Sequence, residues 1–144
     1  MLLNIADWWF NNSWKGNKNV DSIVTLHGAL KNTVWLFYLI IGLWGLFRAI
    51  RGQGVNGSYL GALVVAQIVI VVQVILGAVL FIGGQSGALS RPYMHYLYAA
   101  FGLVFLPFVF LYWLRGDDTN RAQWVLSFAT LFLFGTMVRF GAAF

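Results

Sequence analysis

Four long runs of apolar residues, separated by short polar segments, dominate the chain. They cover about residues 22–50, 58–82, 91–114 and 122–140. Each run is close to or longer than the ~20 apolar residues that a helix needs to cross the hydrocarbon core of a bilayer. The connections RGQGVNG, GGQSGALS and RGDDTN are rich in Gly, Asn, Asp and Ser, as turns are. Short connections make neighbouring helices antiparallel, so the pattern predicts an all-α, integral-membrane, up-down-up-down four-helix bundle.

The bundle is expected to occupy residues 22–144, preceded by a separate segment at 1–21. That segment has an apolar part that is too short and too rich in Trp for a signal peptide. Its three tryptophans and two lysines are typical of an anchor lying among lipid headgroups (Trp8, Trp9, Trp14, Lys15 and Lys18). A frayed tail is the alternative interpretation.

Polar residues and one proline interrupt the second and third runs. Pro107 is expected to kink its helix near Leu103, whose carbonyl loses a hydrogen-bond partner. Gln67 and Gln73 are six residues apart and therefore lie on different faces of the second helix. Gln73 shares a face with small residues and is expected to turn into the bundle, where it bonds a neighbouring helix or the edge of a cofactor. Gln67 is expected to contact another helix or a partner subunit, and no role is assigned to it.

The composition supports a membrane protein and excludes several functional classes. Hydrophobic residues make up 60% of the 144-residue chain and charged residues 9%, whereas a soluble domain has about 25% charged residues. The net charge is +5, but the nine Lys and Arg lie mostly at the ends of apolar runs, so no nucleic-acid partner is expected. The absence of cysteine excludes disulfides, thiolate metal sites and covalently attached c-type haem.

The candidate chemistry lies in His27 and His95, the only histidines. Each lies about one to one and a half turns inside the start of the first or third run. One intervening run separates them, so both helices cross the membrane in the same direction and the imidazoles reach a similar depth. An ionisable residue within a spanning helix is costly and indicates function. The pair is predicted to be the two axial ligands of a haem b, held in a slot walled by aromatic and aliphatic side chains.

Other cofactors remain open at this stage. A chlorophyll-type magnesium could also take a histidine ligand, and the histidines could hold no cofactor at all. Zinc and copper are disfavoured, because no Cys and no nearby carboxylate completes a coordination shell.

Three cations and one amide complete the predicted cofactor site. Arg91 precedes His95 by one turn, Lys31 follows His27 by one turn, and Arg139 lies near the exit of the fourth helix. All three are candidates to meet the haem propionates, although snorkelling to lipid headgroups is the alternative for each. The predicted cofactor-binding set is His27, His95, Lys31, Arg91, Arg139 and Gln73.

Charged residues give a weak indication of orientation. Four arginines flank the connections on one side (Arg48, Arg51, Arg115 and Arg121), against five cations on the other (Lys15, Lys18, Lys31, Arg91 and Arg139). The positive-inside rule barely discriminates between these counts. Two of the five, Lys31 and Arg139, lie within helices and can be explained in other ways. The four-arginine side is therefore placed in the cytoplasm. The N-terminus and both histidines are then expected on the outer side of a cytoplasmic membrane, with a prokaryotic source favoured.

Part of the chain resembles half of the haem A synthase family. The resemblance covers about residues 22–142 and lies in AQIVIVVQVILGAVLFIGG, followed by RPYMHYLYAAFGLV. The positions that match the family pattern are His27, Gln73, Leu76, Gly77, Ala78 and His95. In that family, two four-helix halves each carry a histidine at the outer end of the first and third helices. The resemblance implies haem bound between His27 and His95, and a pairing of two such halves.

The departures from the family pattern bear on catalysis. The catalytic half carries a glutamate just before its first histidine, but this chain contains no Glu, and Asp21 is six residues away from His27. The cysteine pair of many members is also missing. We therefore expect a haem-b protein for electron transfer, or an accessory subunit of a respiratory or photosynthetic complex. Two alternatives stay open: a haem-modifying oxidoreductase, half the size of haem A synthase and active as a dimer, and a structural or pigment-contacting subunit without haem. Partner subunits or a second copy, within the lipid bilayer, are expected.

Overall fold

The structure is a computed structural model that describes residues 18–83 and 92–142. Its helices are α2 (Lys18–Ile50), α3 (Gly57–Ile82), α4 (Pro92–Pro107), which continues as a π-helix η2 (Phe108–Trp113), and α5 (Asn120–Ala142). No strand occurs within these two described ranges. The predicted all-α, four-helix class is confirmed.

The predicted helix limits need small corrections. The first helix begins by Lys18, four residues earlier than expected, so the end of the segment predicted at 1–21 is already helical. Residues 1–17, which hold the predicted tryptophan anchor, lie outside the described residues. The third span changes from α- to π-helix directly after Pro107, whereas the kink is predicted about one turn earlier, near Leu103.

All four spans are long and apolar enough to cross a membrane, namely Lys18–Ile50, Gly57–Ile82, Tyr93–Trp113 and Asn120–Arg139. Much of their outward surface is apolar: Ile40, Ile75 and Leu97 are each more than half exposed. Such a surface is stable in lipid and not in water. The chain is an integral membrane protein.

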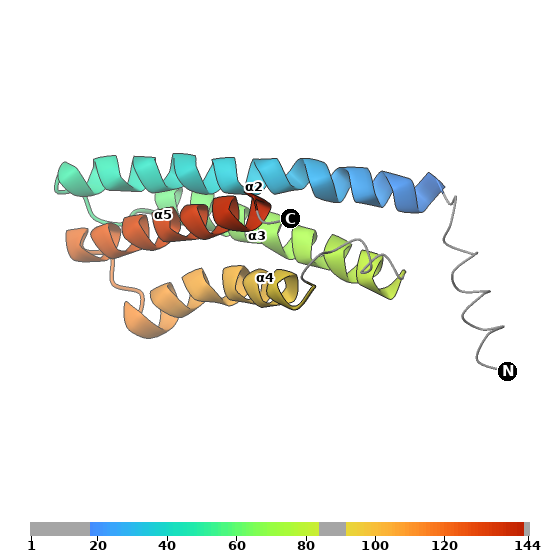
Figure 1. The fold of residues 1–144 in the computed structure, drawn as a ribbon. Coiled ribbons are helices and arrows are strands. Elements are labelled where there is room, and N and C mark those ends of the chain that lie inside the picture. The colour runs from blue at the N-terminus through green and yellow to red at the C-terminus, as the bar shows by residue number, and fades with distance from the viewer. Residues whose placement is uncertain (1–17, 84–91, 143–144) are drawn as a thin grey trace, which may run out of the picture.

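The helices form a ring in chain order. The main contacts join α2 to α3, α3 to α4, α4 to α5, and α5 back to α2. Figure 1 shows α2 and α4 on opposite sides, with α3 and α5 between them. The first and third helices, which carry the two histidines, are therefore diagonal partners that run in the same direction.

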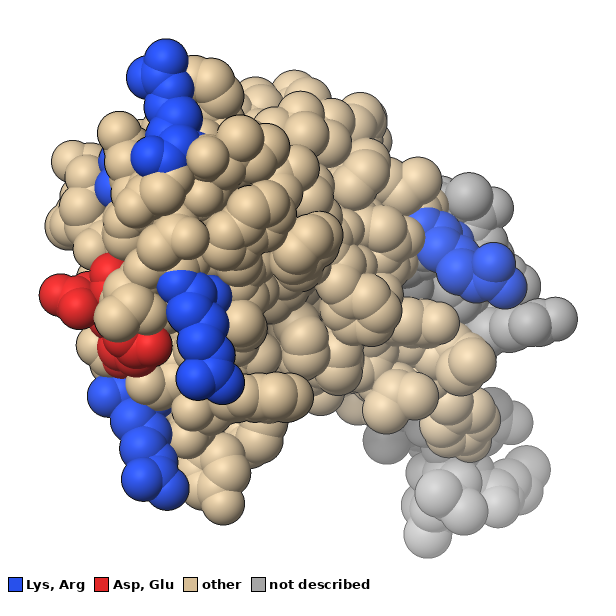
Figure 2. All heavy atoms as spheres, turned by 90° about the vertical axis from the view of Figure 1, so that its left-hand side faces the viewer, with Lys and Arg blue, Asp and Glu red and all other residues tan. Residues whose placement is uncertain are grey.

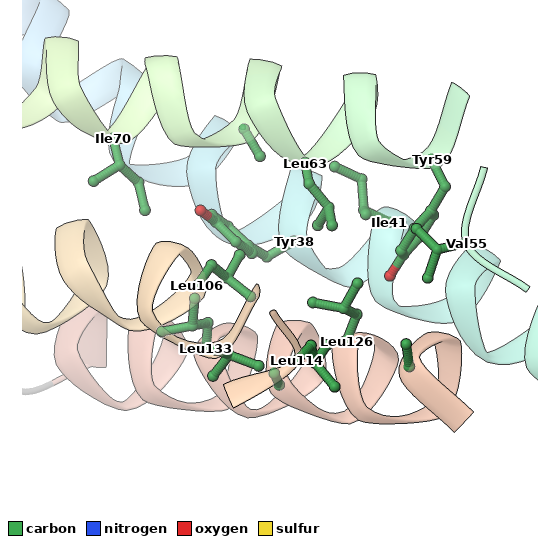
Figure 3. Close-up of a cluster of buried hydrophobic side chains, with 14 of the residues drawn as sticks. Tyr38, Ile41, Val55, Tyr59, Leu63, Ile70, Leu106, Leu114, Leu126 and Leu133 are labelled. Carbon is green, nitrogen blue, oxygen red and sulfur yellow. The ribbon is translucent and has the colours of Figure 1, made fainter. Parts of the chain in front are cut away.

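The closed end of the bundle is the end that holds the connections between α2 and α3 and between η2 and α5. Its apolar core is contributed by all four spans (Figure 3) and includes Tyr38, Ile41, Tyr59, Leu63, Leu126 and Leu133. Tyr38, Tyr59, Leu126 and Leu133 have no exposed surface. Three buried polar residues of α5, Gln123, Ser127 and Thr130, lie beside this core.

Hydrogen bonds join the two connections at the closed end. The Asn120 side chain donates to the backbone carbonyls of Ala49 and Gln53, each at 2.9 Å. The Val55 amide donates to the Asp118 carbonyl at 2.8 Å, and the Arg48 guanidinium donates to the Gly54 carbonyl at 2.7 Å. Figure 2, which views this end, shows basic side chains at several points around it and acidic side chains between them.

Candidate cofactor site

A cavity of about 420 Å³ opens near the start of α2 and α4, at the end of the bundle opposite the closed end. This volume lies within the range of small-molecule and cofactor sites. α2, α3 and α4 provide nearly all of its wall, and Met137 is the one wall residue from the described part of α5. The remaining wall residues are His27, Lys31, Val34, Ile70, Gln73, Val74, Gly77, Ala78, Phe81, His95, Tyr96, Tyr98, Ala99, Ala100 and Leu103.

The two histidines face each other across the bundle. Both imidazoles are partly buried, and their ring centres are 6.1 Å apart with an angle of 48° between the planes. Metal–nitrogen bonds of about 2 Å, with each nitrogen about 1.1 Å from its ring centre, place two rings roughly 6.3 Å apart across one metal. The two rings therefore have the separation that a shared metal ion requires. The sequence prediction that these two side chains come together agrees with the structure.

Two residues of α3 lie beside His27. The Gln73 side chain donates a hydrogen bond of 2.9 Å to the backbone carbonyl of His27. A Cβ atom placed on Gly77 would lie 3.4 Å from Cε1 of the His27 ring. Because Gly77 has no side chain, there is room for the imidazole beside it. Gln73 thus bonds a neighbouring helix, one of the two roles predicted for it, and also lines the cavity.

One nitrogen atom of the His27 ring has no hydrogen-bond partner among the described residues. Its Nδ1 atom is buried and accepts or donates no hydrogen bond within the described part of the chain. A buried ring nitrogen in this condition is unusual, because buried polar groups are normally paired. A structural hydrogen bond at Nδ1 therefore does not account for the position of this ring, and the nitrogen is available to a ligand.

Aromatic rings pack beside His95. The Tyr96 ring meets the His95 ring edge-on at 5.9 Å, and Phe81 of α3 meets Tyr96 edge-on at 5.3 Å. Together with Tyr98, these rings form the aromatic part of the cavity wall. They give an apolar, polarisable surface of the kind that a flat conjugated ligand contacts.

The three predicted cations differ in their position relative to the cavity and in whether the structure describes them. Lys31 lines the cavity and its side chain is exposed. Arg139 is also exposed, but the structure does not place it in the cavity wall. Arg91 lies outside the described residues. Among the described residues, Lys31 is therefore the predicted cation that lines the cavity.

The described part of α5 ends short of the histidines. Gly42 packs on Leu131 and Gly45 on Ser127, which fixes the antiparallel register of α2 and α5. At this register Ala142, the last described residue of α5, lies about level with Lys31, so His27 extends about one turn farther. In Figure 1, α2 continues well past the end of α5. Among residues 18–83 and 92–142, the cavity wall at the level of the histidines therefore comes from α2, α3 and α4.

The site offers two nitrogen ligands and no third protein ligand among residues 18–83 and 92–142. No group of three or more His, Asp, Glu or Cys occurs in this part of the chain. A closed structural zinc site needs four ligands. A metal that already has four ligands in a plane, and needs two more on its axis, matches the donors that are present.

Several wall residues were missed by the sequence reasoning. Nothing in the sequence distinguishes Phe81, Tyr96 and Tyr98 from the other aromatic residues, which occur in every span. A usable signal was present in the small residues Gly77, Ala78, Ala99 and Ala100, which line the cavity from α3 and α4. Small side chains facing each other leave the space that a ligand fills.

No protein-family model, no curated protein and no solved structure matches this chain.

Proposed function

We propose that this membrane protein binds one haem b between His27 and His95 and uses it for electron transfer, either alone or as an accessory subunit of a respiratory or photosynthetic complex. The observation that carries the proposal is the pair of imidazoles from diagonal helices, 6.1 Å apart at the edge of a cavity of about 420 Å³. The donor set, two imidazole nitrogens with no carboxylate among the described wall residues, suits an axial pair.

The residues of the site have separate tasks in this proposal. His27 and His95 would hold the iron, and Lys31 would meet a propionate. Gln73 fixes the backbone of His27 by a hydrogen bond, and Gly77 leaves room for the edge of the His27 ring. The aromatic wall keeps water from the apolar face of the ligand. When bound, a haem with two histidine ligands supplies one-electron transfer and has no open position for oxygen or substrate.

An absorption spectrum of the purified protein tests the proposal directly. We expect the sharp bands of a six-coordinate, low-spin haem b, a pyridine haemochrome of the b type and one haem per chain. A pure, folded protein without haem after expression with sufficient haem supply would contradict it. It would favour a structural or pigment-contacting subunit, and a chlorophyll-type pigment would be visible in the same spectrum.

The proposed orientation places the arginine-rich closed end in the cytoplasm and the cavity at the outer side. It rests on the loop cations Arg48, Arg51, Arg115 and Arg121 and on the positive-inside rule. The chain has no cysteine, so single cysteines report topology without background. An exposed residue at each end is available: Gln53→Cys should react only from the cytoplasm and Ser22→Cys only from outside. The opposite labelling pattern would reverse the orientation.

A haem-modifying enzyme, active as a dimer, is the competing proposal. Its chemistry would need an acid near the ligand, and the nearest carboxylate along α2 is Asp21. Asp21 is about 9 Å from His27 along the helix axis and does not line the cavity. We therefore expect co-expression with a haem O source to yield bound haem b or o and no haem A. Haem A formed by the wild type and lost in Asp21→Asn would establish the enzyme instead.

A further inference from the structure

The third span contains a backbone defect that lies next to the cavity. Pro107 has no N–H group, so the carbonyl of Leu103, four residues earlier, lacks its usual helical donor. Directly after Pro107 the span continues as the π-helix Phe108–Trp113. In a membrane, a carbonyl without a donor is costly unless a neighbouring group bonds to it.

Gln67 of α3 provides that donor. Its side-chain nitrogen donates to the Leu103 carbonyl at 2.6 Å and approaches the Gly102 carbonyl at 3.4 Å. Its side-chain oxygen accepts a longer hydrogen bond, 3.4 Å, from the hydroxyl of Tyr38 on α2. Tyr38 is completely buried. One side chain therefore connects α2, α3 and α4 inside the bundle.

This connection lies at the floor of the cavity. Leu103, whose carbonyl accepts the short hydrogen bond, also lines the cavity, as do Val34 and Ile70, which are one turn from Tyr38 and Gln67 respectively. His95 precedes Leu103 by eight residues of continuous α-helix, about 12 Å of rise. A displacement of α4 at Leu103 is therefore carried to His95.

We propose that Gln67 is a positioning residue that compensates for Pro107 and thereby fixes α4, and with it His95, at the correct distance from His27. The consequence for haem rests on the function proposed above, whereas the consequence for the separation of α2 and α4 does not. Gln67 touches neither imidazole in this account. It acts through the backbone of α4.

A double-mutant cycle tests the compensation. Gln67→Leu removes the donor, and Pro107→Ala restores an N–H group that can bond to Leu103 within α4. Gln67→Leu should lower haem affinity by about 3- to 20-fold, the range that corresponds to hydrogen bonds between membrane helices. In the Pro107→Ala background the same substitution should have a clearly smaller effect. The lost partner of Tyr38 is the same in both backgrounds and cancels in the cycle.

A distance measurement tests the role of Gln67 in placing α4 separately from its effect on haem binding. Spin labels on Leu26→Cys of α2 and Tyr93→Cys of α4, both at exposed positions, report the separation of the two helices without haem. We expect Gln67→Leu to shift or broaden the distance distribution and the added Pro107→Ala to restore it. If haem is never bound, this measurement still tests Gln67. If the distances behave as expected but haem affinity does not change, the haem assignment fails and the role of Gln67 in placing α4 stands.

Gln73→Leu is the matched control, because it removes the other glutamine hydrogen bond from α3 to a neighbouring backbone. Its effect should be the same with Pro or Ala at residue 107. Should Gln67→Leu alone prevent assembly, the double variant is expected to assemble. Equal effects of Gln67→Leu in both backgrounds, or a double variant that also fails to assemble, would overturn the proposal.

Discussion

The two ends of the bundle use the same four helices in opposite ways. At the closed end, a Cβ atom placed on Gly45 of α2 would collide with the Tyr59 hydroxyl and lie 2.6 Å from Ser127 Oγ, so the space is full. At the cavity end, Gly77 of α3 has only the edge of the His27 ring near it. Glycine therefore permits close packing at the closed end and leaves space at the cavity end. Tight packing at one end lets the other retain a space that a simple bundle would fill.

Polar side chains bond to backbone carbonyls at both ends of the bundle. At the closed end, the hydroxyls of Ser127 and Thr130 bond to carbonyls of their own helix, each at 2.6 Å. Gln123 and Asn120 of α5 donate across to carbonyls of α2 at the same end, and Gln73 of α3 donates across to α2 at the cavity end. Hydroxyls that bond within their own helix permit close helix packing, and the amide side chains fix the position of one helix against another at both ends.

The largest effect on stability is expected from Gly45→Ala. The added methyl group collides with the Tyr59 hydroxyl and Ser127 Oγ, and both residues are buried. Overpacking of this kind lowers the free energy of unfolding by about 1–3 kcal/mol. Unfolding in mixed micelles measures it, with Gly61→Ala as the control because a Cβ atom there meets nothing within 4 Å. Equal stability of the two variants would show that the closed end is not tightly packed.

A smaller effect is expected at the cavity, from Lys31→Met. A cation near the ligand favours the reduced, less positive iron, so its removal should lower the midpoint potential. At an effective dielectric constant near 20, a charge about 8 Å away contributes about 2 kcal/mol before screening. Because Lys31 is exposed, screening reduces this to about 1 kcal/mol or less, or about 40 mV or less. Redox titration measures the shift, and Arg51→Met at the closed end should cause none. An unchanged potential with haem retained would mean that Lys31 snorkels to headgroups.

Gly77→Ala should be tolerated, in contrast to Gly45→Ala. Its methyl group would lie in ordinary contact with the His27 ring, at 3.4 Å. We expect a change in the free energy of unfolding below about 1 kcal/mol, together with a small shift of the ligand absorption bands. The same micelle unfolding assay and an absorption spectrum measure both quantities. A loss of stability as large as that of Gly45→Ala would remove the distinction between the two ends.

The smallest effect is expected in the connection after η2. The Asp117 carboxylate accepts hydrogen bonds from the Thr119 amide at 3.0 Å and the Thr119 hydroxyl at 2.9 Å, which hold the pKa of Asp117 below its ordinary value of 3.8. A pKa that is lower in the folded state contributes stability above the unfolded pKa and loses it as the pH falls through the folded pKa. Unfolding measured from pH 6 to pH 2 should therefore lose a small acid-dependent component in Asp117→Asn. An unchanged pH profile would contradict this.

The sequence was sufficient for the fold and for the meeting of the histidines. Apolar runs of spanning length defined the helices to within a few residues, and counting crossings placed His27 and His95 on parallel helices at one end. The contact between Gln67 and Leu103 could not be predicted, because it depends on which face of α3 meets α4. The level at which the described part of α5 ends beside the cavity depends on the register of α5 against α2, which apolar side chains of similar hydropathy do not specify. Arg139 was predicted to join the site from its depth in the membrane alone, and this depth does not determine the face of the helix on which the residue lies.

The most direct test of the central claim is the reduced-minus-oxidised absorption spectrum of the wild type beside those of His27→Ala and His95→Ala. One imidazole cannot fill both axial positions of an iron, so each substitution should abolish the six-coordinate, low-spin spectrum while the bundle remains folded. Equal effects of the two substitutions are expected, because the two rings share one metal. An unchanged low-spin spectrum in either variant would show that the two histidines do not hold one haem between them.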